Sequence, residues 1–151
     1  MAEAAANRLW VGEDGNVTIS LDQADSVISA ARKVAGELGE AVAVAVVEVG
    51  GKMVAFACMD GAARYTTEIA KRKAEAAIAL GFDTVHMTTA TPEGQPLVGG
   101  PRQSGTHSLV PNGGGVIIRV GGTVLGALGV SGAASSITDH RIGTAAVAQW
   151  D

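Results

Sequence analysis

The sequence predicts an α+β domain in which helices flank a central antiparallel sheet of about five strands. Three observations lead to this prediction: two apolar runs are each divided by a Gly-Gly pair, a helix-forming segment follows each run, and aromatic residues make up only 3% of the chain. A glycine pair between β-branched runs is typical of a β-hairpin. A core rich in Ala and Val lets sheet and helices approach closely.

The N-terminal part predicts an arm followed by a helix. Residues 1–15 show no steady period, so we expect an irregular arm and then one domain over residues 16–151. Ser20 and Gln23 have the spacing of a capping box, and apolar residues recur at helical intervals as far as Gly39. This segment is the first predicted helix.

Two hairpins, each followed by a helix, account for most of the remaining chain. The first hairpin turns at Gly50-Gly51 and precedes a helix over residues 66–80; the second turns at Gly121-Gly122 and precedes a helix over residues 135–150. The Gly/Pro-rich stretch over residues 91–115 separates them, with a short strand expected at 107–110. A loop of this length usually has a function, and we expect it to cover the ligand pocket of its own or of a neighbouring subunit.

A constant offset of 71 residues relates the two hairpins, because Val49-Gly50-Gly51 corresponds to Val120-Gly121-Gly122 and Asp60 to Ser131. The sequence therefore predicts a pseudo-repeated ββα unit. Asp60 and Ser131 stand at equivalent strand-to-helix junctions, where unpaired N–H groups favour an anion. Either side chain can instead satisfy those donors itself, as a turn or capping residue.

Lys73 falls on the apolar face of the helix over residues 66–80. A buried ammonium needs a partner, so Lys73 is expected to reach the edge of the helix, to pair with Asp60 or Asp139, or to meet a bound anion. Asp139 also has a local alternative, because Ser136 and Asp139 have capping-box spacing. His140 adds a titratable group beside it.

Composition excludes several classes of partner. The formal net charge is −4 and the 11 Lys and Arg residues are scattered, which argues against nucleic acid and membrane as partners. No apolar run suggests a signal sequence or a membrane span, and we expect a cytoplasmic protein. Cys58 is the only cysteine, which excludes an internal disulfide, and we expect it to be buried in its strand. The three histidines lack metal-ligand spacing, so no metal site is expected.

Several segments resemble one protein family. "VVEVGGKMVAFACMDGA", "AKRKAEAA", "FDT" and "LGALGVSGAASSITDH" are together similar to the bacterial haem-binding/glycolate-locus (GlcG/HbpS-like) family, which includes the C-terminal domain of a corrinoid adenosyltransferase. The similarity runs from about residue 20 to residue 150. It implies a profilin-like fold and homo-oligomers ranging from dimers to octamers.

The resemblance also implies a ligand pocket. The residues that match the family's motifs and would line or brace this pocket are Asp60, Lys73, Thr84, Gly129, Ser131, Gly132 and Asp139. Cys58 replaces an arginine of the family, and Arg64, one helical turn further on, is the candidate substitute cation. Haem is the ligand that the resemblance suggests, but the residues nominate no axial ligand for it.

Two functions fit these residues. The favoured one is a small homo-oligomeric protein that holds an organic anion or a tetrapyrrole at the strand-to-helix junctions. The alternative is a cofactor-independent lyase, hydratase or isomerase acting on a small organic acid, in which Lys73 stabilises an anion or enolate and Asp60 or Asp139, helped by His140, moves a proton. A scaffold that only oligomerises is a third hypothesis, and it would leave Lys73 paired and no cavity to fill.

Overall fold

The computed structural model describes residues 9–88 and 112–150. The elements in these ranges are, in chain order, β1 (Trp10–Val11), β2 (Val17–Thr18), α2 (Leu21–Glu37), β3 (Ala43–Glu48), β4 (Met53–Cys58), α3 (Thr66–Leu80), the 3₁₀ helix η1 (Thr84–Thr88), β5 (Gly115–Val120), β6 (Thr123–Ser131) and α4 (Ser136–Trp150). Strands β3 to β6 form one antiparallel sheet in the order β4-β3-β6-β5, and β1 and β2 form a separate two-stranded sheet.

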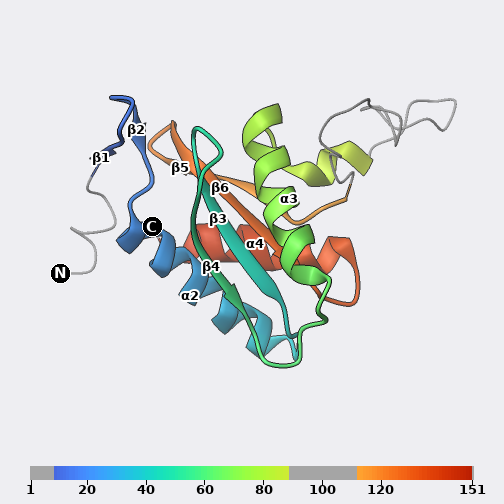
Figure 1. Ribbon diagram of the computed structural model, residues 1–151. Helices are drawn as coiled ribbons and strands as arrows, with labels where there is room; N and C mark the ends of the chain where they lie inside the picture. The colour runs from blue at the N-terminus through green and yellow to red at the C-terminus, as the bar shows by residue number, and fades with distance from the viewer. Residues whose placement is uncertain (1–8, 89–111, 151) are drawn as a thin grey trace, which may run out of the picture.

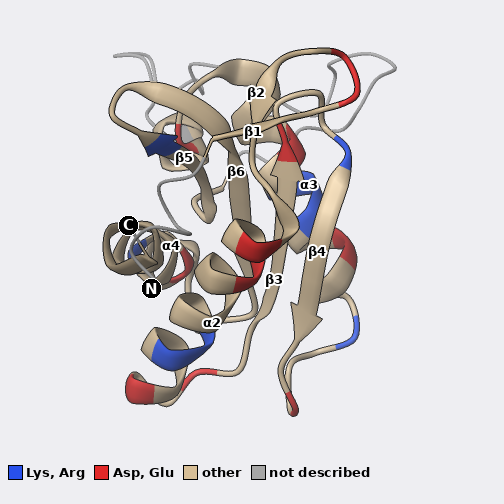
Figure 2. Cartoon of the chain, turned by 90° about the vertical axis from the view of Figure 1, so that its left-hand side faces the viewer, with Lys and Arg blue, Asp and Glu red and all other residues tan. Residues whose placement is uncertain are grey.

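The central sheet lies between two layers of helix. Helices α2 and α4 pack together on one face, and α3 crosses the other face over β3, β6 and β5 (Figure 1). The view turned by 90° shows the same layers, with α2 and α4 on one side of the strands and α3 on the other (Figure 2). Helix α3 leaves the edge strand β4 largely uncovered on its own side of the sheet.

The α+β class is confirmed, but the central sheet has four strands rather than about five. The two-stranded sheet formed by β1 and β2 is not among the elements that the sequence predicts, because strands of two residues are too short to show a period. The strand expected at residues 107–110, and the loop from residue 91 as far as residue 111, lie outside the described residues.

Each hairpin is followed by its helix, but the two helices lie on opposite faces of the sheet. Hairpin β5–β6 is displaced from hairpin β3–β4 by two strand positions across the sheet. Ala43 on β3 pairs with Cys58 on one side and with Ser131 on the other. The ends of β4 and β6 therefore lie two strand spacings apart, or about 10 Å. Both strand-to-helix junctions are thus at the same end of the sheet.

Helix α2 begins where the sequence predicts, because Ser20 and Gln23 form a reciprocal capping box. Its buried face packs with α4 and the sheet in the main core. The fully buried side chains of this core include Val27, Val42, Val44, Val46, Ile118, Leu125, Leu128 and Ile142. The opposite face is built largely from alanines, which bring the backbone of α3 close to the strands.

Positions of Lys and Arg and positions of Asp and Glu both occur along the helices and turns of the described residues (Figure 2). None of the helices in residues 9–88 and 112–150 has the length and apolar character needed to cross a membrane.

Candidate functional site

Lys73 and Asp139 form a buried ion pair that connects α3 with α4. Lys73 Nζ lies 2.9 Å from Asp139 Oδ2, and the two side chains are 4% and 5% exposed. Nζ also donates to the carbonyl oxygen of Val130 at 3.1 Å, near the end of β6. The second carboxylate oxygen, Asp139 Oδ1, accepts from the backbone N–H of Ala133 at 2.9 Å. The ammonium and the carboxylate are therefore engaged within the chain, and the two helix layers are joined around the end of the sheet.

The capping box expected from Ser136 and Asp139 is wrong. Ser135 caps α4 instead, since its Oγ accepts from the backbone N–H of Thr138 at 3.1 Å. Because Ser135 takes the capping role, the Asp139 carboxylate is directed back to Ala133 and across to Lys73. Asp60, the other acid considered as a partner for Lys73, is exposed and is not part of this pair.

Burial raises the pKa of Asp139 above its ordinary value of 3.8, because the charged form loses its hydration. The charge of Lys73 and the N–H of Ala133 act in the opposite direction and limit the rise. Loss of hydration is the larger effect.

We therefore expect Asp139 to make the folded chain less stable as the pH rises. With its folded pKa above 3.8, the folded chain binds this proton more tightly than the unfolded chain. The resulting stabilisation is complete below the unfolded pKa and is lost as the pH rises through the folded pKa. Urea unfolding of the wild type and of Asp139→Asn from about pH 3 to pH 7 measures this. The free energy of unfolding of the wild type relative to the variant should fall with rising pH; a flat or rising difference would contradict the assignment.

Thr84 and three consecutive glycines enclose the ion pair. Thr84 is fully buried, and its Oγ1 donates to the carbonyl oxygen of Asn112 at 2.6 Å and accepts from the N–H of Gly115 at 2.9 Å. A Cβ built on Gly114 would lie 2.9 Å from Lys73 Nζ, so no larger residue fits there without displacing the lysine. The chain entering β5 thus packs directly on the buried ammonium.

His140 follows Asp139 on α4 and is partly buried. Its Nδ1 atom is buried without a hydrogen-bond partner among the described residues. A Cβ on Gly113 would lie 3.3 Å from the Cβ of His140, so the histidine packs against the same glycine segment. The structure therefore brings Lys73, Asp139 and His140 to one region and leaves Asp60 outside it.

At the β6–α4 junction, the predicted glycines allow the chain to pack closely against neighbouring backbone segments. Ser131 is buried at the end of β6. A Cβ on Gly132, whose φ is 121°, would lie 2.9 Å from the carbonyl oxygen of Ala41. Gly129 lies against the backbone of α3, where a Cβ would be 2.7 Å from the nitrogen of Ala74.

The β4–α3 junction, by contrast, is exposed. Asp60, Arg64 and Tyr65 all lie at the surface, and Tyr65 is 68% exposed. No ion pair within the described ranges engages Arg64. The expectation that Cys58 is buried is wrong, because the thiol is exposed. Cys58 occupies the edge strand, on the side of the sheet where α3 leaves β4 uncovered.

An apolar strip leads to this junction along β4. Phe56 contacts the cluster of Ala43, Ala45 and Ala70 on the α3 side of the sheet. Cys58 is two residues further along the strand, so it faces the same side. Met53, which is 43% exposed, pairs with Val47 and also lies on that side. We call the surface formed on this side of β4 by Met53, the half-buried Phe56 and Cys58 the β4 strip.

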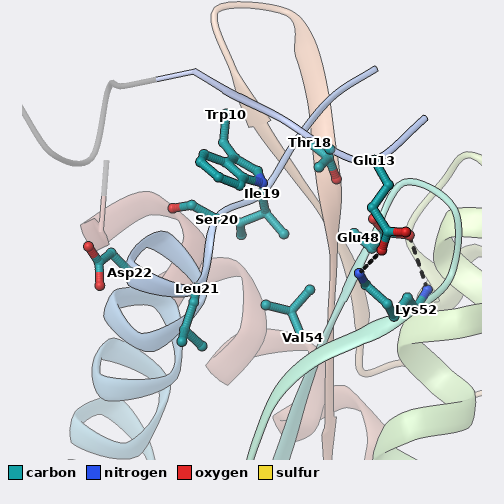
Figure 3. A pocket seen from close by; sticks show the side chains of 11 residues that line it. Trp10, Glu13, Thr18, Ile19, Ser20, Leu21, Asp22, Glu48, Lys52 and Val54 are labelled. Atoms are coloured by element: carbon teal, nitrogen blue, oxygen red, sulfur yellow. Dashed lines mark hydrogen bonds and ion pairs between the residues drawn. The ribbon is translucent and has the colours of Figure 1, made fainter. Parts of the chain in front are cut away.

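A cleft lies at the other end of β4. It has a volume of about 760 Å³ and is formed by the β1–β2 sheet, the start of α2 and the β3–β4 turn. Trp10 and Asp22 lie on one side of it and Glu48 and Lys52 on the other (Figure 3). Lys73 and the other residues predicted to form the site do not line it.

Neither the β4 strip nor this cleft is predicted by the sequence. The hairpin pattern alone does not tell which of its strands lies at an edge, so the exposure of Cys58 depends on the strand order. Trp10 precedes any periodic segment, although an aromatic side chain in a chain with only two tryptophans is a signal that could have drawn attention to it.

The sequence model of a family described as "HbpS-like: Haem degrading protein HbpS-like" matches residues 19–148. The search of curated proteins found no significant match to the chain.

Three solved structures are similar over most of their length. Klebsiella pneumoniae protein ORFY is 29% identical, with a TM-score of 0.79, and the match covers 93% of this chain and 97% of that protein. The PduOC:heme complex is 28% identical, with a TM-score of 0.76, covering 87% and 94%. HbpS is 26% identical, with a TM-score of 0.76, covering 88% and 90%.

Proposed function

The chain belongs to the HbpS-like family, and from this premise we propose that it is a small homo-oligomeric protein that binds a tetrapyrrole, or another flat organic anion, at the exposed β4–α3 junction. One relative, PduOC, was crystallised with haem, which supports this class of ligand. The observation that carries the proposal is the exposure of Cys58, Arg64 and Tyr65 on one short stretch of chain beside an apolar strip.

The side chains at this junction fit the chemistry of haem. Thiolate and phenolate are both known axial ligands of haem iron, and Cys58 and Tyr65 present these groups at the surface. Arg64 supplies a cation for a propionate. Phe56, two residues before Cys58 on β4, gives the apolar surface on which a macrocycle lies. When bound, haem would supply redox and oxygen chemistry; the chain's own residues hold and orient it.

The cleft at the opposite end of β4 does not fit haem. Its lining includes no His, Cys, Met or Tyr, and so it offers none of the usual axial ligands. It also holds three acidic residues, Glu13, Asp22 and Glu48, against one lysine, Lys52, which disfavours two propionates. Haem is therefore assigned to the junction and not to the cleft.

The geometry favours binding over the cofactor-independent lyase, hydratase or isomerase. In that mechanism Lys73 must meet the substrate, yet its ammonium already bonds to Asp139 and Val130. Releasing it would leave the Asp139 carboxylate buried without its partner, at a cost of several kcal/mol. We assign Lys73 and Asp139 a structural role.

Titration with hemin tests the proposal. We expect a saturable shift of the Soret band with the wild type, and at least about a tenfold weaker affinity, with a displaced Soret maximum, for Cys58→Ser. Arg64→Ala should weaken binding by about two- to fivefold, because an exposed ion pair contributes about 1 kcal/mol or less.

Arg32→Ala, which removes an exposed arginine from α2, is the matched control and should bind hemin as the wild type does. Native mass measurements with and without hemin report the number of subunits and the number of haems. A wild type that gives no Soret shift, or a Cys58→Ser variant with the spectrum and affinity of the wild type, would contradict this assignment.

A further inference from the structure

The cleft at the β3–β4 turn has the size of a ligand site. Its volume of about 760 Å³ lies within the range of about 300–1,000 Å³ that small-molecule sites occupy. Met53 begins β4 at this end and Cys58 ends it at the other, so the cleft is about 17 Å from the junction assigned to haem. It is a separate site.

Exposed apolar side chains line this cleft. Trp10 is 52% exposed and Leu21 is 57% exposed, although both are large and apolar. The residues on either side of Trp10, Leu9 and Val11, are also exposed. Four of the eight exposed large hydrophobic residues in the described ranges thus gather at this end of the molecule, which is typical of a binding surface.

The charged groups in the cleft are mostly acidic. Three of them are carboxylates, from Glu13, Asp22 and Glu48, and one is the ammonium of Lys52, which gives a formal charge of −2. Lys52 Nζ is 3.3 Å from Glu13 Oε1, and the backbone N–H of Lys52 donates to Glu48 Oε1 at 3.4 Å (Figure 3). The lysine is thus already paired, and an incoming anion meets net negative charge.

The two hydroxyl groups of the walls are occupied. Thr18 Oγ1 donates to the carbonyl oxygen of Leu125 at 3.0 Å and accepts from the N–H of Val49 at 3.1 Å. Ser20 Oγ accepts from Gln23 N–H as the cap of α2. No hydrogen bond or ion pair within the described ranges engages the Asp22 carboxylate. Among the side-chain acceptors of the walls, the carboxylate oxygens are therefore the ones open to a ligand.

We propose that this cleft binds a small organic cation, a primary amine with an apolar or aromatic body. The body lies between Trp10 and Leu21, and the ammonium donates to one of the two carboxylates, Asp22 on the side of Trp10 or Glu48 on the opposite side, while the other carboxylate adds to the negative field. The indole face of Trp10 adds a cation–π attraction, worth about 0.5–2 kcal/mol or roughly a two- to thirtyfold change in affinity. This inference goes beyond the haem proposal and does not depend on it.

Three probes with one carbon framework test the charge preference: phenethylamine, phenethyl alcohol and phenylacetate. The readout is the indole N–H signal of Trp10 in a proton–nitrogen NMR spectrum, identified by its loss in Trp10→Phe. We expect phenethylammonium to shift this signal with saturation in the millimolar range, the alcohol to bind several-fold more weakly, and phenylacetate to bind weakest. Added salt should weaken the binding of phenethylammonium but not that of the alcohol.

Charge variants test the residues. Asp22→Asn and Glu48→Gln should each weaken the binding of phenethylammonium by about two- to fivefold. Trp10→Ala should weaken it by about two- to thirtyfold; because this variant lacks the indole signal, its binding is measured from the line broadening of the probe. Asp25→Asn, which removes an exposed acid from α2 outside the cleft, is the matched control. Each variant is first checked for an unchanged circular dichroism spectrum.

The outcomes separate the two proposals. Equal affinities for the three probes, a preference for phenylacetate, or Asp22→Asn and Glu48→Gln variants that bind as Asp25→Asn does, each overturn the cation site. Hemin titration of Asp22→Asn should match the wild type. If the wild type binds phenethylammonium but not hemin, the cation site stands and the haem proposal fails. If it binds hemin but not phenethylammonium, only the cation site is contradicted.

Discussion

Replacement of Lys73 with methionine is expected to lower the free energy of unfolding by about 3–5 kcal/mol. The reason is that Asp139, whose side chain is 5% exposed, would be left without its ammonium partner. Its pKa would rise further, so the loss should be largest near neutral pH and smaller in acid, where the carboxyl group is protonated. Val130 would also lose the donor to its carbonyl oxygen.

A double-mutant cycle measures the interaction directly. Asp139→Asn alone leaves the Lys73 ammonium buried without its carboxylate partner, but it also removes the buried negative charge whose loss of hydration raises the pKa of Asp139, so it should cost less than Lys73→Met. Lys73→Met/Asp139→Asn removes both charges, and the asparagine can still accept from the N–H of Ala133. We expect its loss of stability to be smaller than the sum of the two single losses by at least about 1 kcal/mol. Urea unfolding of the four proteins at one pH checks this, and strictly additive losses would show that the two groups do not interact.

Gly129→Ala is expected to destabilise the fold by at least about 3 kcal/mol. A Cβ at this position would meet the backbone of α3, within 2.7 Å of Ala74 N and also close to the carbonyl oxygen of Ala70. Backbone atoms of a helix cannot move aside as a flexible side chain does. The helix must therefore shift away from the sheet, and the alanine contacts beneath it are lost.

Gly36→Ala is the matched control for this substitution. Gly36 lies in α2, and no atom lies within 4 Å of a Cβ built there. Because alanine has the higher helix propensity, this change should be neutral or stabilising by up to about 1 kcal/mol. Thermal or urea unfolding of the two variants compares them. If Gly129→Ala is as stable as Gly36→Ala, the close packing of α3 on β6 is not a constraint on the fold.

Much of the fold follows from local signals in the sequence. The capping box at Ser20 and Gln23 and the two glycine turns locate the first long helix and both hairpins, because each signal acts within a few residues. The order of strands in the sheet and the face on which each helix packs do not follow, since they depend on contacts between distant segments. The two-stranded sheet at Trp10 is too short to leave a pattern.

In the candidate site, too, some features follow from local sequence signals and others depend on contacts between distant segments. The helical wheel places Lys73 on a buried face and thereby requires a partner, but the choice between Asp60 and Asp139 depends on α4 lying across the end of β6. The exposure of Cys58 likewise depends on β4 being an edge strand. Sequence patterns state which groups need partners, and only the tertiary arrangement decides which partners they find.

The most direct test of this account is a hemin titration of Lys73→Met/Asp139→Asn, performed under conditions where circular dichroism shows that the variant is folded. If the ion pair is structural and the ligand lies at the exposed β4–α3 junction, the Soret maximum should match that of the wild type, with a dissociation constant within about twofold. A folded double variant that no longer binds hemin would contradict the account, because it would place the ligand on Lys73 itself.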